Sequence, residues 1–107
     1  MPSLAEWYIV RFDESRIALQ VNPPHGNPWS DEIPWQHIIR ICFKTGDWFE
    51  SDEVYIFTNQ RPESYVIPTE ANGGQELWFE ILKRNLFDAE LAVEAAKTIG
   101  QLFCFPM

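Results

Sequence analysis

Two histidines and two cysteines are the side chains that could carry out acid–base or nucleophilic chemistry. His25 and His37 are the only side chains whose unperturbed pKa lies near neutrality, so proton transfer at neutral pH would need one of them. His37 precedes Cys42 by five residues in a strand-like stretch. That spacing puts the two side chains on opposite faces of a strand, which argues against a Cys–His pair acting as a thiol nucleophile.

The two cysteines show no pattern typical of a metal site or of a disulfide framework. Cys42 and Cys104 lie far apart in the sequence, and neither belongs to a Cys-x-x-Cys motif. We therefore expect two buried, reduced thiols, and we expect neither a metal nor a cofactor.

A double glycine, Gly73 and Gly74, stands just ahead of a helix-like run, where many proteins hold a phosphate. A nucleotide-binding loop normally supplies Lys and then Ser or Thr after its glycines, whereas this chain supplies Glu76 and Glu80. These carboxylates complement the helix dipole and would repel phosphate. We interpret the double glycine as a flexible turn from strand to helix.

Acidic and aromatic residues are concentrated in the segment "TGDWFESDE", residues 45–53. A calcium loop would need alternating oxygen ligands and an internal glycine, and neither is present, so metal binding is not expected. Two interpretations stay open: a solvated hairpin tip, or a patch for a basic partner. The residues of this patch are Asp47, Trp48, Glu50, Asp52 and Glu53.

A second candidate for recognition is Trp29, in the proline-rich segment 23–34. The four prolines and one glycine of this segment predict a surface loop without helix or central strand. A tryptophan outside regular structure either folds back on the core or anchors a partner, and both interpretations stay open for Trp29. For His25 in the same loop, a solvated residue is the favoured interpretation and recognition of a partner is the alternative.

The charge of the chain narrows the choice of partners. Sixteen acidic residues against eight basic ones give a net charge of −8, which repels polyanions. The basic residues are scattered, so nucleic acid and anionic membranes are not expected partners. The start of the chain has no leader-like segment, and no apolar run approaches the roughly 18 residues of a membrane span. We expect no membrane insertion and a cytoplasmic location.

Alternating apolar residues predict a meander of about five antiparallel strands. Residues 7–13 and 14–22 form a hairpin, followed by strands in 35–46 and 51–59 and a short strand in 64–68. In the third strand, Ile39, Ile41 and Phe43 are expected on one face. Pro68 ends the last strand or places it at a sheet edge.

From Gln75 the apolar residues recur at helical spacing and form a stripe of Trp78, Ile81, Leu82, Ala89, Ala92, Val93, Ala96 and Ile99. Asn85 interrupts this stripe and Asp88 could cap a new first turn, so the pattern predicts two helices or one bent helix, ending at Gly100. The apolar tail 101–107 is expected to pack against the sheet. The chain is predicted to be a single α+β domain, residues 1–107.

The run "EIPWQHIIRI", an initial hairpin, two further strands and a terminal helix resemble the small bacterial pleckstrin-homology-like domains. Trp35, Ile38, Ile41 and the "YVIP" run stand where that superfamily places apolar residues. The resemblance implies a strongly bent antiparallel sheet with a C-terminal helix or helix pair packed on it. Members that bind phosphoinositides have a basic loop between the first two strands, whereas this chain has "FDESRI". Lipid binding at that loop is therefore not expected.

We expect a non-catalytic interaction module. It would bind either another protein, for which a basic protein is one candidate, or a second copy of itself. The expected partner-binding residues are Trp29, Asp47, Trp48, Glu50, Asp52 and Glu53. The alternative is a small-molecule or lipid-binding domain with a pocket between sheet and helix, where His37 or Arg40 would orient the ligand.

Overall fold

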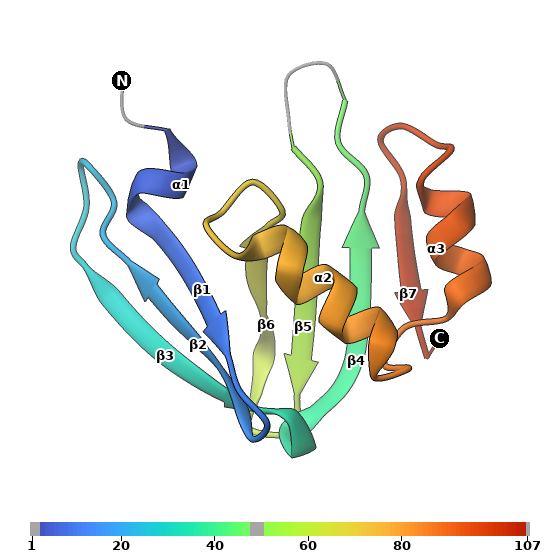
Figure 1. The fold of residues 1–107 in the computed structure, drawn as a ribbon, viewed down its shortest axis with the longest axis horizontal. Coiled ribbons are helices and arrows are strands. Elements are labelled where there is room, and N and C mark those ends of the chain that lie inside the picture. Colours follow the sequence, from blue (N-terminus) through green and yellow to red (C-terminus); the bar gives the residue numbers. More distant parts are fainter. Residues whose placement is uncertain (1–2, 48–50, 107) are drawn as a thin grey trace.

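The chain folds into two antiparallel sheets and short helices, as shown by a computed structural model that describes residues 3–47 and 51–106 (Figure 1). The α+β class predicted from the sequence is confirmed. In chain order the elements are α1 Leu4–Trp7, β1 Tyr8–Phe12, β2 Arg16–Val21, β3 Trp29–Pro34, the 3-10 turn η1 Trp35–His37, β4 Ile38–Lys44, β5 Glu53–Thr58, β6 Arg61–Pro68, α2 Gly74–Lys83, α3 Ala89–Ala95 and β7 Leu102–Phe105.

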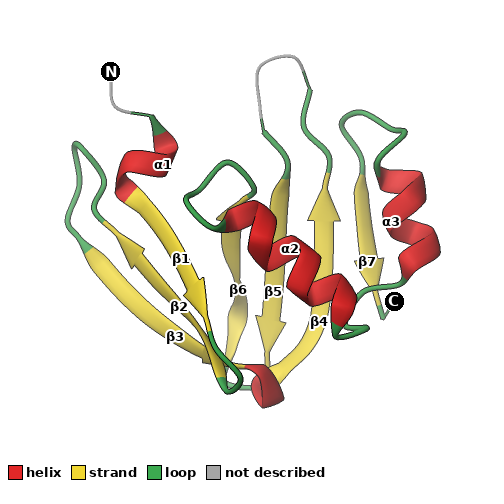
Figure 2. Cartoon of the chain, in the orientation of Figure 1, coloured by secondary structure: helices red, strands yellow, loops and turns green. Residues whose placement is uncertain are grey.

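The strands form two sheets rather than one meander of five strands. One sheet has the order β1-β2-β3 and the other has the order β6-β5-β4-β7, and the two do not close into a barrel (Figure 2). The five strands expected from the sequence thus become seven in the described part of the chain. Both additional strands lie at sheet edges, where short segments with few local signals can be held by one neighbour.

The first hairpin was predicted correctly and is fixed by its turn. The Asp13 carboxylate accepts hydrogen bonds from the backbone N–H groups of Ser15 and Arg16, at 2.8 and 3.0 Å, and these bonds lower the pKa of Asp13. β1 and β2 then pair antiparallel, with Val10 opposite Leu19. The expected inward face of β2 is confirmed, since Ile17, Leu19 and Val21 are all buried.

The proline-rich segment is not all loop, which corrects the sequence prediction. Residues 29–34 form β3, which pairs antiparallel with β2. Pro34 ends the strand, and β3 lies at a sheet edge, where a missing N–H costs no bond within the sheet. Ile33, directly opposite Ile17, is buried and joins the strand to the core.

In β4 the prediction for Ile39 was wrong. The pairing of β4 with β5 shifts register between Ile38 and Arg40, and this irregularity leaves Ile39 56% exposed. Beyond it the expected alternation resumes, and Ile41 and Phe43 face the core. β6 ends at Pro68 and lies at a sheet edge, as predicted.

Two helices, α2 and α3, follow β6, which is one of the two arrangements expected. The Asp88 carboxylate accepts a hydrogen bond from Leu91 N at 3.4 Å and caps α3, as predicted. α3 ends at Ala95 rather than at Gly100, and Val93 is exposed although it was expected on the apolar stripe. In place of Val93, Ala95 faces the core.

The core lies between the two sheets and α2, which crosses in front of the four-stranded sheet in Figure 1. Trp78 of α2 stacks on Phe43 of β4 with ring centroids 4.3 Å apart and meets Phe87 edge-on. At the end of α2, the Arg84 guanidinium lies 4.0 Å from the ring centroid of Trp35, whose Nε1 donates to Asp13 O. These contacts join the helix to both sheets.

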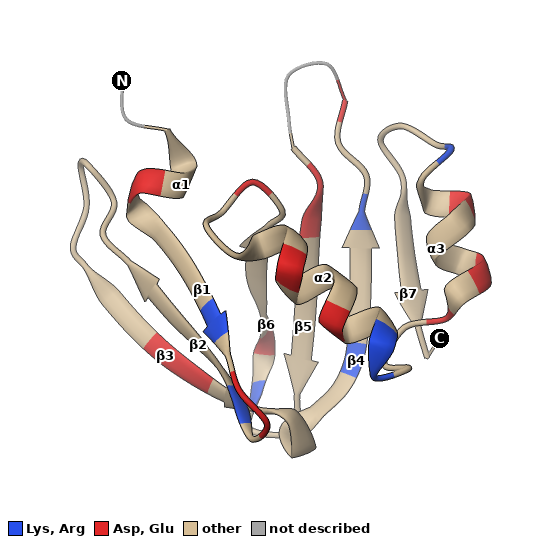
Figure 3. Ribbon diagram, viewed as in Figure 1, with Lys and Arg blue, Asp and Glu red and all other residues tan. Residues whose placement is uncertain are grey.

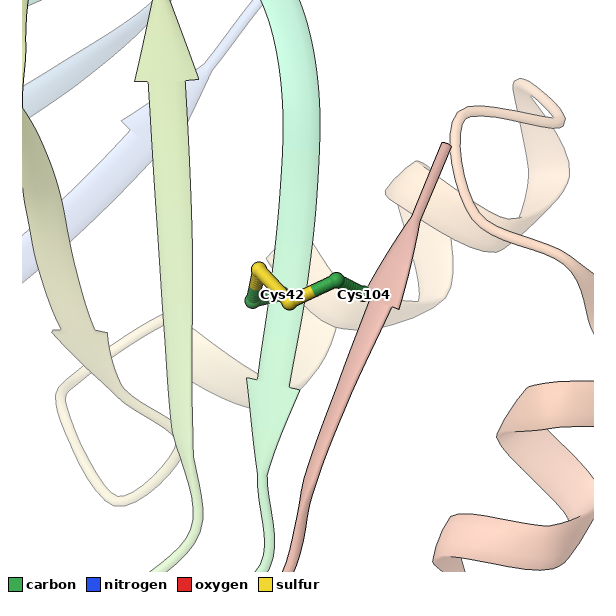
Figure 4. The surroundings of a disulfide bond; sticks show 2 residues. All are labelled: Cys42 and Cys104. Atoms are coloured by element: carbon green, nitrogen blue, oxygen red, sulfur yellow. A yellow bond between two sulfur atoms is a disulfide. The ribbon is translucent and has the colours of Figure 1, made fainter. Parts of the chain in front are cut away.

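The cysteines form a disulfide, which corrects the expectation of two reduced thiols. Cys42 of β4 and Cys104 of β7 lie directly opposite each other and are joined by an S–S bond of 2.01 Å (Figure 4). Their neighbours Ile41 and Phe43 face the core, so the bond lies on the outer face of the sheet. The tail that was expected to pack against the sheet is therefore an edge strand held to β4 by a covalent bond.

Candidate interaction surface

The structure divides the expected partner-binding residues between the two sheets. Trp29 is the first residue of β3, whereas Asp52 and Glu53 lie at the start of β5 in the other sheet. Asp47 is exposed just after β4. Trp48 and Glu50 lie outside the described residues.

Trp29 combines both interpretations that the sequence left open. Its ring meets the buried Tyr8 edge-on, with centroids 6.3 Å apart, yet 45% of the residue is exposed. Tyr8 is itself fixed, because its hydroxyl donates to Val66 O at 2.6 Å, and burial raises the pKa of Tyr8 to about 12. Trp29 is thus an exposed aromatic ring that packs against the ring of Tyr8, which is itself held in place. Its side chain would therefore lose little conformational entropy when a partner binds.

Two acidic residues that the sequence analysis did not single out accompany Trp29 on β3. Asp31 and Glu32 follow it in the strand, and Glu32 pairs with Arg16 of β2 at 2.6 Å. The Asp31 carboxylate accepts the Glu32 N–H at 2.8 Å. The alternation of Trp29, Asp31 and Ile33 was the local signal for this strand, but the flanking prolines concealed it.

At the other candidate location, Asp52 and Glu53 have structural partners. Asp52 Oδ1 accepts the Gly46 N–H at 2.6 Å, and the Asp52 carbonyl accepts the Thr69 N–H at 3.0 Å. Glu53 accepts from the Tyr55 hydroxyl at 3.0 Å. These bonds hold the ends of β4, β5 and β6 together, so Asp52 organises this end of the sheet in addition to any role in binding.

Charged residues are spread over many elements of the described chain (Figure 3). Figure 3 shows acidic positions on α1, β3, α2 and α3 and at the start of β5, with basic positions scattered between them. A basic partner would therefore be attracted by the overall negative charge and positioned by local groups such as Trp29, Asp31 and Glu32.

His37 and Arg40, the expected ligand-orienting residues, lie in different places. His37 lines a cavity of about 340 Å³ between β3 and the β5–β6 hairpin, together with Asp31, Thr58, Gln60 and Tyr65. Arg40 lies on β4 with its guanidinium 5.7 Å from the ring centroid of Phe57, and it is not part of that cavity lining. The sequence analysis expected a ligand pocket between sheet and helix. The cavity that contains His37 lies between strands instead, so that expectation is wrong for this cavity.

An open trough of about 660 Å³ lies over the three-stranded sheet. It is lined by Ile9, Arg11, Ala18, Leu19, Gln20, Ser30, Asp31 and Glu32. The Arg11 guanidinium also lies beside the double glycine and donates to Val10 O at 2.9 Å. No arrangement in the sequence predicts this trough, because its residues come from three strands.

The double glycine has a packing role. Gly73 has a φ of 90° and caps α2, and a Cβ there would collide with the backbone carbonyl of Val10. A Cβ on Gly74 would meet the carbonyl oxygens of Pro68 and Thr69. Glycine is therefore required because α2 begins against β1 and the end of β6.

Cys42 forms the disulfide with Cys104, so it is not a free thiol in this structure. Among residues 3–47 and 51–106, no group of three His, Cys, Asp or Glu side chains could hold a metal ion. In the same part of the chain, no helix is long and apolar enough to cross a membrane.

Comparisons with protein-family models, with curated proteins and with solved structures found no match to this chain.

Proposed function

We propose that the protein is a non-catalytic interaction module that binds a basic protein partner through an acidic and aromatic surface. The observation that carries the proposal is Trp29, which is exposed yet packed against Tyr8 at the start of an acidic edge strand. The net charge of −8 steers a basic partner into encounter, and Trp29 with Asp31 and Glu32 anchors it. Asp47, Trp48, Glu50, Asp52 and Glu53 form a second part of the surface in this proposal.

The experiment is affinity capture of the tagged protein from its host lysate at low and moderate salt, followed by titration of the captured partner against variants. Trp29→Ala and the pair Asp31→Asn with Glu32→Gln should weaken binding at least tenfold, as expected for anchors at the centre of an interface. Phe79→Ala, at a 63% exposed aromatic residue on α2, is the matched control and should bind like the wild type. Unchanged binding of the β3 variants would refute this assignment.

The variant Trp48→Ala with Glu50→Gln tests the second part of the surface separately. Loss of binding in this variant alone would move the interface to the connection between β4 and β5. Loss in both sets would extend the surface across the two sheets.

The second candidate function is binding of a small polar molecule in the cavity beside His37. The specific observation is that Asp31, Thr58, Gln60 and Tyr65 converge with His37 on one cavity, and that burial, followed by the charge of Asp31, raises the pKa of Tyr65. A fragment screen monitored by NMR checks it, because ligands of this cavity should shift the His37 signals and lose binding in Gln60→Ala. The Trp29 variant should leave that binding intact.

Membership of the pleckstrin-homology-like superfamily is a further proposal, whereas the cytoplasmic location expected from the sequence conflicts with the disulfide. The superfamily is supported by antiparallel sheets followed by a helix, although α3 and β7 extend beyond that pattern. The disulfide argues against a strongly reducing compartment, since disulfides persist mainly in oxidising ones. Alkylation of free thiols in intact cells before lysis tests the location, because a cytoplasmic protein should be labelled at both cysteines.

A further inference from the structure

At three of the four sheet edges, local hydrogen bonds or prolines occupy or remove some of the outward backbone groups. At the β1 edge, Val10 N–H donates to Asn72 O at 2.7 Å, and Asn72 N–H donates to Tyr8 O at 2.9 Å. At the β3 edge, the Glu32 N–H is occupied by the Asp31 carboxylate at 2.8 Å. Each such bond occupies a backbone group that an incoming strand would need.

The β6 edge is partly occupied in the same way. Val66 O accepts the Tyr8 hydroxyl at 2.6 Å, and Ser64 O accepts from the Arg61 guanidinium at 3.1 Å. Pro62 and Pro68 lack N–H donors altogether. An incoming strand would find few free backbone groups here.

The β7 edge differs, because its outward backbone groups have no partner in the described part of the chain. Thr45 N–H donates to Gln101 O at 2.8 Å, which fixes the alternation of the β4–β7 ladder. Bonded and non-bonded pairs alternate along an antiparallel ladder, so Phe103 bonds to β4, whereas Leu102 and Cys104 direct their N–H and C=O groups away from it. β7 contains no charged residue and no proline that would block pairing.

Exposed apolar side chains are frequent in the C-terminal segment that contains β7. Leu102 is 57% exposed and Phe105 36%, and Ile99 and Val93 nearby in the chain are exposed by 63% and 55%. These four are half of the eight large exposed hydrophobic residues in the described part of the chain, so apolar surface is concentrated in the C-terminal segment. α3, which carries Val93, contacts β7 and lies beside it in Figure 1.

We propose that β7 pairs antiparallel with β7 of a second copy of this chain, about a two-fold axis at Phe103. In this register Leu102 of each copy lies opposite Cys104 of the other, and the outward N–H and C=O groups of both residues pair completely. Two four-stranded sheets would thereby become one continuous sheet. The Cys42–Cys104 disulfide supports the arrangement, because it holds β7 in place before pairing.

This self-association is independent of the proposed binding of a basic partner, and salt distinguishes the two. β7 itself contains no charged residue while each chain carries −8, so screening of the repulsion should strengthen the dimer as salt rises. Binding of a basic partner should weaken over the same range.

The test is sedimentation of the oxidised full-length protein from micromolar to millimolar concentration, at low and moderate salt, with amide hydrogen exchange on the same samples. We expect twice the mass of one chain at high concentration, and slow exchange at the Leu102 and Cys104 amides only where the dimer is populated. A single-chain mass at every concentration and salt would overturn the proposal. So would a dimer in which these two amides exchange freely.

Two variants locate the interface. Leu102→Lys places a charge on the open edge, and Leu102→Pro removes an N–H that β4 does not use, so both should reduce the mass to that of one chain. Val66→Lys, at a 41% exposed position on the β6 edge, is the matched control and should dimerise like the wild type. Circular dichroism confirms that each variant is folded, and a dimer that persists in folded Leu102→Lys would refute the assignment to β7.

Discussion

Reduction of the Cys42–Cys104 disulfide should destabilise the protein by about 4 kcal/mol. The two cysteines are 62 residues apart, and closing a loop of that length removes about 14 cal/mol/K of entropy from the unfolded chain in the chain-entropy model. That entropy corresponds to about 4 kcal/mol at 25 °C, an upper value because engineered and natural disulfides often contribute less. A loss of this size is a large fraction of the roughly 5–15 kcal/mol that stabilises a typical domain.

The assay is urea unfolding of the oxidised and the reduced wild-type protein, followed by tryptophan fluorescence. With a slope of about 1.5 kcal/mol per molar urea, typical for a domain of this size, the midpoint should fall by about 2 to 3 M on reduction. Reduction keeps both side chains, so the shift isolates the cross-link. The double variant Cys42→Ala with Cys104→Ala should unfold near or below the reduced protein, because Cys42 is buried and its replacement also leaves a small cavity.

Thiol titration before unfolding is the control for this experiment. The oxidised protein should show no reactive thiol after denaturation, and the reduced protein should show two, since Cys42 and Cys104 are the only cysteines. Equal midpoints for verified oxidised and reduced samples would refute the reasoning. Two free thiols in protein exposed to oxidant would refute the disulfide itself.

Three further predictions concern single residues. Burial raises the pKa of Tyr8 from 10.0 to about 12. The neutral Tyr8 side chain therefore stabilises the fold fully below pH 10, and this contribution is lost as the pH rises to 12. Urea midpoints should fall more steeply between these pH values for the wild type than for Tyr8→Phe. Gly73→Ala should cost about 3 kcal/mol, from the left-handed backbone and the collision with Val10, whereas Gly100→Ala, with φ 67° and no heavy atom within 4 Å, should cost about 1 kcal/mol. Equal unfolding midpoints for the two glycine variants would contradict this account. Asp88→Ala should cost about 1 kcal/mol through loss of the α3 cap, and Asp88→Asn, which can still cap, should restore most of it in thermal unfolding.

The features that the sequence predicts correctly depend on neighbouring residues. The first hairpin follows from the alternation of Ile17, Leu19 and Val21 and from a turn that Asp13 closes on itself. The start of α3 follows from Asp88, whose side chain reaches only three residues along the chain. Such signals need no knowledge of the rest of the fold.

The features that the sequence misses depend on distant partners. β3 is preceded by Pro28 and ends at Pro34, and it becomes a strand because β2 lies beside it and Ile33 is buried opposite Ile17. The exposure of Ile39 results from an irregularity in the pairing with β5, which no pattern within β4 reveals. The candidate surface was incomplete for the same reason, since Asp31 and Glu32 join Trp29 only once β3 is recognised as a strand.

β7 is the clearest case of structure imposed from outside the segment. It has four residues, all of them apolar or cysteine, and a segment of that length and composition could as well be an unstructured tail. Pairing with β4 and the bond to Cys42 make it a strand. The same bond leaves β7 as an ordered edge whose outward backbone groups have no partner among residues 3–47 and 51–106. The disulfide therefore connects the stability of the domain with its proposed self-association, because loosening β7 would remove both the cross-link and the edge that a second copy needs.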